Sequence, residues 1–351
     1  MLTKIIICQQ NNLIYTFAYS FNRLAYVLKD TPELATEAIF KARLSKYNQN
    51  SRTAFIEYLP GHCGYLNLPP ELAVQEGSII PVQLIWMGDN NKQPKFRYGW
   101  QLVGKYVVYL ANSPQRISSK NLNSPHTREQ LVDLLTKTPG NWVVRSNVQE
   151  LSDLQLLKQE MSYLYQQAKE IQNNLSHKNQ AGFANYLKLI RELPLASNCE
   201  IISNNDKINN ELLHYQQLWQ IDAITLDKSL NINELIDNYE AKLQTTQINL
   251  NNGASLEIHS LSGINLIDVN SDKIVTSNNS LNFIVLDDIY HQILFRNLQG
   301  IILIDFIKNM PKTEQNKIIT YLEKLFKIDI SHTKVLGFTN AGLCELVRNK
   351  F

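Results

Sequence analysis

Over the first hundred residues, apolar and β-branched side chains recur in short runs between polar turns. This alternation predicts β-strands, because successive side chains of a strand point to opposite faces. The expected strands cover residues 4–8, 13–19 and 23–28, and then residues 38–44, 53–58 and 79–86. Gly61, Gly64, Pro69-Pro70 and Gly77 punctuate the second set. That spacing is typical of a small antiparallel barrel.

The middle of the chain changes from the period of a strand to that of a helix. Strands are expected at residues 105–110 and 142–145, with a helix at 125–137 between them. The clearest helix follows Ser152 and Gln155, which form a capping box, because apolar residues then recur at helical spacing as far as Ile171. The polar runs at residues 172–180 and 204–210 are typical of linkers, and a further helix is expected at 231–243.

The last hundred residues contain two matched apolar runs, and each run ends in an aspartate. One ends at Asp268 and the other at Asp305, with helical periodicity over residues 281–297 between them. A strand, a helix and a strand in this order predict parallel neighbours joined by a right-handed crossover. A helix at residues 313–326 and a strand near 327–330 would continue this sheet.

These two aspartates are the strongest candidates for chemistry. The carboxyl ends of parallel strands meet at one edge of a sheet, so Asp268 and Asp305 would face one small volume. Close carboxylates favour a cation between them, and hard oxygen ligands suit Mg²⁺. Asn270 could orient a water or a scissile phosphate in metal-assisted phosphodiester hydrolysis. The competing interpretation is that each acid caps the following helix or binds backbone amides in a turn.

The barrel region combines aromatic and basic residues, as single-stranded nucleic acid requires for base stacking and phosphate pairing. The aromatics are Phe55, Tyr58, Tyr65, Phe96, Tyr98 and Trp100, and the basic residues near them are Lys92, Lys95 and Arg97. Alternating aromatics are usually core, so at least half should be buried, with Phe55 and Tyr65 the candidates for exposure. Asp287 and Asp288 are expected to be solvated or to interact with a helix dipole.

Composition narrows the class of protein. The chain has 351 residues, of which 44% are hydrophobic and 19% charged, as in a globular protein of two or three packed units. A net charge of +2 requires any nucleic-acid role to rest on local basic clusters, at residues 92–97 and 116–120. Four scattered cysteines indicate neither a zinc knuckle nor a disulfide framework and fit a reducing cytoplasm. No apolar stretch reaches membrane-spanning length.

At this point the sequence resembles the ribonuclease E/G family. The family's two strand motifs stand here as Leu266-Ile267-Asp268-Val269-Asn270-Ser271 and Gly300-Ile301-Ile302-Leu303-Ile304-Asp305-Phe306-Ile307. Shorter matches follow the family's order at residues 253–255, 330–332, 335–339 and 342–348, and others lie in the amino-terminal half. The resemblance covers nearly the whole chain and is weakest between residues 178 and 249.

The resemblance implies an α/β fold, of the α+β multi-subdomain kind. Residues 1–35 and 180–250 would form a ribonuclease H-like subdomain, 36–103 an OB-type RNA-binding barrel, 104–179 a sensor of the RNA 5′ end, and 251–351 a deoxyribonuclease I-like catalytic subdomain. By the same likeness, Asp268, Asn270 and Asp305 would perform hydrolysis, with Mg²⁺ held by the two aspartates. Phe55, Tyr65 and Lys92 would grip RNA near the cut, Arg145 and Ser146 would hold a 5′-monophosphate, and Arg348 would contact RNA.

The expected activity is that of a cytoplasmic endoribonuclease in RNA processing and decay. It would cut single-stranded AU-rich RNA, such as mRNA and rRNA precursors, leave 5′-phosphate ends and favour 5′-monophosphorylated substrates. The chain departs from the family at residues 282–285, where Asn-Phe-Ile-Val replaces Asn-Leu-Glu-Ala, and at Lys308 and Asn340. A non-catalytic RNA-binding member and an unrelated Mg²⁺-dependent phosphohydrolase are therefore alternatives. A homodimer stays open, and the family's zinc-linked tetramer is not expected.

Overall fold

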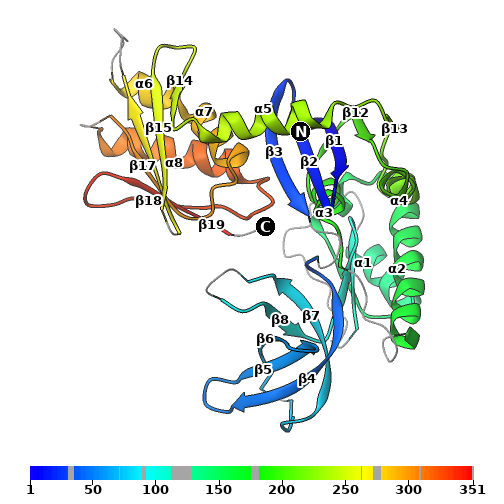
Figure 1. The fold of residues 1–351 in the computed structure, drawn as a ribbon. Helices are drawn as coiled ribbons and strands as arrows, with labels where there is room; N and C mark the ends of the chain where they lie inside the picture. Colours follow the sequence, from blue (N-terminus) through cyan, green and yellow to red (C-terminus); the bar gives the residue numbers. More distant parts are fainter. Residues whose placement is uncertain are drawn as a thin grey trace. The chain divides into compact units, whose positions relative to one another are not determined.

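The structure of the chain is a computed structural model that describes residues 1–30, 35–70, 72–88, 92–111, 128–174, 182–261, 263–271, 278–307 and 310–349 (Figure 1). The chain divides into two compact units. The first contains Met1–Lys29, Glu192–Asn210 and Asp222–Phe351, and the second contains Asp30–Arg191 and Glu211–Ile221. No helix of the described residues has both the length and the apolar character that crossing a membrane requires.

The first sheet of unit 1 has the strand order β13-β12-β1-β2-β3. Its strands are β1 Leu2–Gln10, β2 Leu13–Ser20, β3 Arg23–Asp30, β12 Leu195–Ser203 and β13 Ala223–Leu226. The three strands predicted at the start of the chain are confirmed and are longer than expected. Helix α5, Ile232–Gln244, packs Ile236 and Tyr239 against the sheet residues Phe17 and Val27.

A linker predicted at residues 204–210 is wrong, because helix α4, Asp206–Gln216, begins inside it. The Asn205 side chain accepts hydrogen bonds from the backbone N–H groups of Lys207 at 2.9 Å and Ile208 at 3.1 Å. The polar residues of this segment therefore cap a helix start, which a composition-based interpretation does not distinguish from a linker.

The second sheet of unit 1 has the order β14-β15-β16-β17-β19-β18. Its strands are β14 Gln247–Asn249, β15 Ser255–Leu261, β16 Ile264–Asn270, β17 Gly300–Asp305, β18 Lys334–Phe338 and β19 Cys344–Arg348. Strands β16 and β17 are parallel neighbours, as predicted. Helices α6 Asn278–Ile284, α7 Leu286–Phe295 and α8 Lys312–Phe326 lie together along one face of this sheet (Figure 1).

Two expectations for this region need correction. The single helix expected at residues 281–297 is two helices, α6 and α7, which meet at the fully buried Val285. The strand expected near residues 327–330 is absent from this described segment, which forms a turn. Its apolar residues Ile328 and Ile330 resemble a strand, but the Asp329 carboxylate accepts the backbone N–H of Ser331 at 3.3 Å and closes the turn.

Unit 2 contains a closed five-stranded barrel of order β4-β5-β6-β8-β7, which confirms the predicted OB-like barrel (Figure 1). The strands are β4 Ile39–Asn48, β5 Thr53–Leu59, β6 His62–Asn67, β7 Ile79–Trp86 and β8 Lys95–Tyr98. Alternate residues such as Leu44, Ile56 and Phe96 fill the interior. Gly64 is required there, because a Cβ at this position would lie 2.5 Å from the Phe96 ring.

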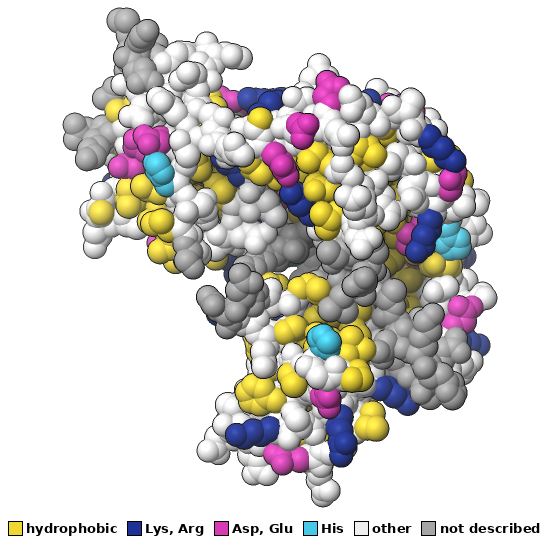
Figure 2. Space-filling view, viewed as in Figure 1, with side chains coloured by type: hydrophobic (Ala, Val, Ile, Leu, Met, Phe, Trp, Pro, Cys, Tyr) yellow, Lys and Arg dark blue, Asp and Glu magenta, His cyan; other side chains and the backbone are white. Residues whose placement is uncertain are grey.

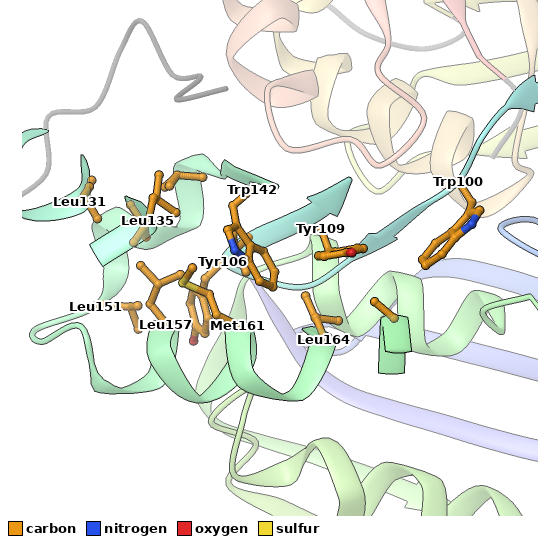
Figure 3. Packing of buried hydrophobic residues seen from close by; sticks show 14 of the residues in the cluster. Trp100, Tyr106, Tyr109, Leu131, Leu135, Trp142, Leu151, Leu157, Met161 and Leu164 are labelled. Carbon is orange, nitrogen blue, oxygen red and sulfur yellow. The ribbon is translucent and has the colours of Figure 1, made fainter. Parts of the chain in front are cut away.

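The rest of unit 2 packs a small sheet against helices. It contains β9 Gln101–Val103, β10 Val107–Leu110, β11 Trp142–Val144, α1 Arg128–Lys137, the 3-10 helix η1 Ser146–Glu150, α2 Gln155–Asn174 and α3 Asn185–Glu192. Figure 3 shows Tyr106, Tyr109 and Trp142 facing Leu157 and Met161 of α2. The basic cluster expected at residues 116–120 lies outside the described residues.

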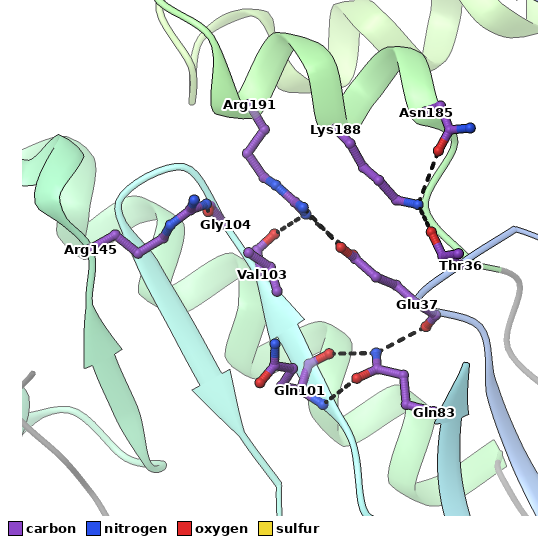
Figure 4. A network of polar contacts seen from close by, with 10 residues as sticks. All are labelled: Thr36, Glu37, Gln83, Gln101, Val103, Gly104, Arg145, Asn185, Lys188 and Arg191. Carbon is purple, nitrogen blue, oxygen red and sulfur yellow. Dashed lines mark hydrogen bonds and ion pairs between the residues drawn. The ribbon is translucent and has the colours of Figure 1, made fainter. Parts of the chain in front are cut away.

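A buried polar network ties the barrel to α3 (Figure 4). The Arg191 guanidinium donates to Glu37 at 2.9 Å and to the Val103 carbonyl at 2.8 Å. The Asp30 carboxylate accepts the backbone N–H of Asn185 at 2.9 Å, and Lys188 donates to Thr36. Burial raises the pKa of Asp30 to about 6 and lowers the pKa of Lys188 to about 8.

Candidate functional site

The two candidate aspartates lie side by side on the second sheet of unit 1. Asp268 on β16 is in register with Asp305 on β17, so one strand spacing, about 4.8 Å, separates their backbones. Their neighbours Ile267, Val269 and Ile304 are buried, whereas both aspartates are half-buried. Because strand residues alternate between faces, both carboxylates lie on the face opposite the buried side chains.

Among the described residues, the hydrogen bond to this acid pair comes from a side chain and not from a backbone amide. The Asn270 amide donates to the Asp268 carboxylate at 3.0 Å, so Asn270 orients this carboxylate. Within the described ranges, no backbone amide donates to the carboxylate of Asp268 or Asp305.

Two further residues beside the pair were not singled out from the sequence. Glu257 on β15 is in register with Asp268, which makes a row of three acids, and its carboxylate contacts His259 Nε2 at 2.8 Å. Asn282 of α6 is fully buried and binds both the N–H and the C=O of Ile307 at 3.0 Å. It thereby fixes the chain two residues after Asp305. The sequence signal that could have identified Glu257 is the hairpin formed by β15 and β16, which pairs Glu257 with Asp268.

The donor set of this site fits magnesium. Mg²⁺ keeps several waters and binds proteins through one or two carboxylates together with substrate phosphates. Asp268 and Asp305 supply two such carboxylates on an accessible sheet face. Among the residues that the structure describes, no group of three or more His, Cys, Asp or Glu side chains could form a complete metal cage. The described residues therefore offer two aspartates to a metal at this place, and not three protein ligands.

The barrel presents a row of four residues across four neighbouring strands. Phe55 is in register with Tyr65, Lys46 lies opposite Phe55 on one side, and Lys95 lies beside Tyr65 on the other. All four point outward, since the residues that alternate with them fill the barrel. Phe55 is 39% exposed, as predicted, whereas Tyr65 was expected to be exposed and is half-buried. Tyr58, Phe96 and Trp100 are buried, which confirms that at least half of the six aromatics are core.

This row places two aromatic faces between two ammonium groups, which suits stacked bases flanked by phosphates. The roles of Lys46 and Lys95 depend on strand register, so the sequence did not single them out for this row. Lys92, which was expected to bind RNA, is exposed and lies three residues before Lys95, the first residue of β8. Figure 2 shows hydrophobic side chains reaching the surface of the barrel beside basic ones.

Arg145 and Ser146, expected at the RNA 5′ end, lie at the start of η1. Ser146 is exposed, and Arg145 is half-buried. The Arg145 guanidinium donates to the Gly104 carbonyl at 2.6 Å (Figure 4). The backbone N–H of Arg145 donates to the Tyr106 carbonyl at 2.9 Å. The turn between β9 and β10 therefore holds this arginine at two points.

The position of Arg348 does not fit the RNA contact expected for it. Its side chain is 1% exposed, and it donates to the Asp329 carboxylate at 2.9 and 3.1 Å. It also donates to Asn297 Oδ1 at 2.7 Å and to the Leu298 carbonyl at 3.0 Å. Arg348 is thus a buried structural residue, and its charge is compensated inside the unit.

Asp287 and Asp288 lie in the first turn of α7, where an acidic residue interacts favourably with the helix dipole, as predicted. Asp287 accepts a hydrogen bond from the Tyr321 hydroxyl at 3.1 Å, and Asp288 forms an ion pair with Arg23. Neither residue takes part in the acid row of the sheet.

Comparison with known proteins identifies the family of this chain. The Ribonuclease E/G family profile matches residues 101–351, and the chain belongs to this family. Ribonuclease E of Synechocystis sp. is 22% identical over 295 residues, which are 77% of this chain and 44% of the relative. A Ribonuclease E/G-like protein of Porphyra purpurea is 23% identical, over 77% of this chain and 57% of the relative.

Ribonuclease G of Escherichia coli is 22% identical over 307 residues, which are 79% of this chain and 60% of the relative. The chain spans about half the length of the curated relatives that it matches.

Proposed function

We propose that this chain is a Mg²⁺-dependent endoribonuclease that cuts single-stranded AU-rich RNA, leaves 5′-phosphate ends and favours 5′-monophosphorylated substrates. The observation that carries the proposal is the in-register pair Asp268 and Asp305 on an accessible sheet face, in a chain of the ribonuclease E/G family. The relatives are named as ribonucleases, and their names support the reaction class.

The acid pair would hold the metal, and Asn270 would keep the Asp268 carboxylate in a fixed orientation. Bound Mg²⁺ supplies charge that polarises a phosphoryl oxygen and acidifies a coordinated water. Hydrolysis would join a water oxygen to phosphorus and break the bond from phosphorus to the 3′ oxygen, which would take a proton. The products would be a 3′-hydroxyl and a 5′-phosphate.

The outward row of the barrel would bind the single strand. Bases would stack on Phe55 and Tyr65, and the phosphates on either side would pair with Lys46 and Lys95. Stacking accepts every base, so this row supports binding to single strands rather than sequence choice.

The test is cleavage of a fluorescent 5′-monophosphorylated AU-rich RNA, with Mg²⁺ or with EDTA. Wild type is expected to cut only with Mg²⁺, and Asp268→Asn and Asp305→Asn to lose at least about a hundredfold in rate, since each removes charge at the proposed metal. Asp287→Asn is the matched control, because it makes the same change in α7, away from the acid row. Equal rates in wild type and both aspartate variants would refute the assigned site.

One observation favours a second candidate, a catalytically degenerate RNA-binding member. Helix α6 offers no carboxylate where the family has an acid, and Phe283 and Ile284 are exposed there instead. This alternative predicts that the same RNA binds tightly to the wild type in Mg²⁺ and stays intact.

A further inference from the structure

We propose that Glu160 is a positioning residue for Arg145 and acts through two peptide groups of the turn at residues 104–107. The inference rests on the proposed role of Arg145 in binding the RNA 5′-phosphate. Glu160 lies in the middle of α2 and is 1% exposed. A carboxylate buried to this extent needs hydrogen bonds or a counter-charge, because burying an unpaired charge costs free energy.

The Glu160 carboxylate receives four N–H donors, two on each oxygen. Lys105 N at 2.7 Å and Trp219 Nε1 at 3.0 Å donate to Oε1, and Tyr106 N at 2.8 Å and Val107 N at 3.2 Å donate to Oε2. Three successive backbone N–H groups thus converge on one anion. Burial raises the pKa of Glu160, and the hydrogen bonds from Tyr106 and Lys105 oppose that rise.

The same peptide groups that bind Glu160 also bind Arg145. A trans peptide is planar, so its N–H and its C=O point in opposite directions. In the 104–105 peptide, the N–H donates to Glu160 at 2.7 Å and the C=O accepts the Arg145 guanidinium at 2.6 Å. In the 106–107 peptide, the N–H donates to Glu160 at 3.2 Å and the C=O accepts the Arg145 backbone N–H at 2.9 Å.

Glu160 is therefore linked to Arg145 through two peptide groups, one that binds the Arg145 guanidinium and one that binds its backbone N–H. An N–H that donates to a carboxylate is polarised, which strengthens the carbonyl of the same peptide as an acceptor. The negative charge of Glu160 both aims and strengthens the carbonyls that hold Arg145. Bidentate phosphate recognition needs a guanidinium in a fixed orientation, so this support would affect binding of the 5′ end.

The close fit of this turn gives a second way to disturb it. A Cβ on Gly104 would lie 2.4 Å from Glu160 Cδ and 2.6 and 2.7 Å from its oxygens. Gly104→Ala would therefore displace the carboxylate while leaving Glu160 and Arg145 chemically intact. Glu160→Gln keeps the side-chain shape but replaces one acceptor oxygen by an NH₂ group, so that two of the four donors lose their acceptor.

The experiment measures Kd for a short 5′-monophosphorylated RNA and for the same RNA with a 5′-hydroxyl, in EDTA to prevent cutting. Wild type should bind the phosphorylated RNA more tightly, and Arg145→Gln should remove that preference. Glu160→Gln and Gly104→Ala should each reduce the ratio of the two Kd values by about tenfold, the usual scale for hydrogen bonds to a charged group. Tryptophan fluorescence of each variant verifies that unit 2 is folded.

Glu170→Gln is the control, because Glu170 is an exposed carboxylate of the same helix and should leave the ratio unchanged. A merely structural role for Glu160 would weaken binding of both RNAs equally and would overturn the inference. If folded Glu160→Gln and Gly104→Ala keep the wild-type ratio, only the positioning role fails. A wild type that binds both RNAs equally overturns the 5′-end role of Arg145 and the inference with it.

Discussion

Replacing Arg348 by alanine should unfold unit 1 at a lower denaturant concentration and should leave RNA binding by the folded protein unchanged. The guanidinium makes two bonds to Asp329 and two more to Asn297 and Leu298, with both members of the ion pair buried. These contacts join the loop between α7 and β17, the end of β19 and the turn after α8. Removing the arginine leaves the Asp329 charge buried without its partner, which costs about 3–5 kcal/mol.

The distribution of tryptophans makes this prediction measurable. All four, Trp86, Trp100, Trp142 and Trp219, belong to unit 2, so their fluorescence reports that unit, whereas far-UV circular dichroism reports both. In urea, Arg348→Ala should shift the circular dichroism transition and leave the fluorescence transition in place. The double variant Asp329→Leu with Arg348→Met should recover part of the loss, because apolar side chains often replace a buried ion pair without loss of stability.

The reasoning is refuted if Arg348→Ala costs less than about 1 kcal/mol, the range of an exposed ion pair. It is also refuted if the variant keeps its stability and loses affinity for single-stranded RNA. That second result would support the RNA-binding role that was expected for Arg348 from the sequence.

Three further predictions test other parts of the molecule. The pKa of Asp30 is raised from 3.8 to about 6, so between these two pH values the folded state binds more protons than the unfolded state, and the stability of unit 2 should fall by roughly 3 kcal/mol as the pH rises from 3.8 to 6. Asp30→Asn should remove this pH dependence in fluorescence-monitored urea titrations, and an unchanged pH dependence would contradict the role of Asp30. Phe55→Ala should weaken single-stranded RNA binding by about 1–3 kcal/mol in a fluorescence anisotropy titration, with the exposed Ile79→Ala of the same barrel as the unaffected control. Gly300→Ala should destabilise unit 1 more than Gly263→Ala, as measured by circular dichroism. Both glycines have φ near +80°, but only a Cβ at position 300 would lie 2.5 Å from a backbone oxygen. Equal losses of stability would show that the positive φ, and not the close contact, sets the cost.

Much of the fold follows from local pattern. The barrel, the three opening strands and the parallel strands that end at Asp268 and Asp305 were predicted because side chains alternate with period two in a strand whatever its partners. Phe55 was correctly expected to be exposed, although the expectation rested on the nearby glycine turn, whereas the structural reason is that its neighbours Ala54 and Ile56 face the barrel interior. Apolar runs and glycine punctuation therefore determined the kind of elements and the candidate acids.

Residues far apart in the sequence decided the rest. Register placed Glu257 beside Asp268 and put lysines on both sides of the Phe55–Tyr65 pair, and register depends on which strands pair. Arg348 was an expected RNA ligand, but it is half of a buried ion pair, because the fold brings the end of β19 to Asp329 in the turn after α8. The four donors of Glu160 likewise come from one turn and from Trp219, which only the tertiary fold brings together. The sequence does not show whether an ionisable side chain contacts solvent, substrate or a buried partner, because tertiary packing decides which of these surrounds it.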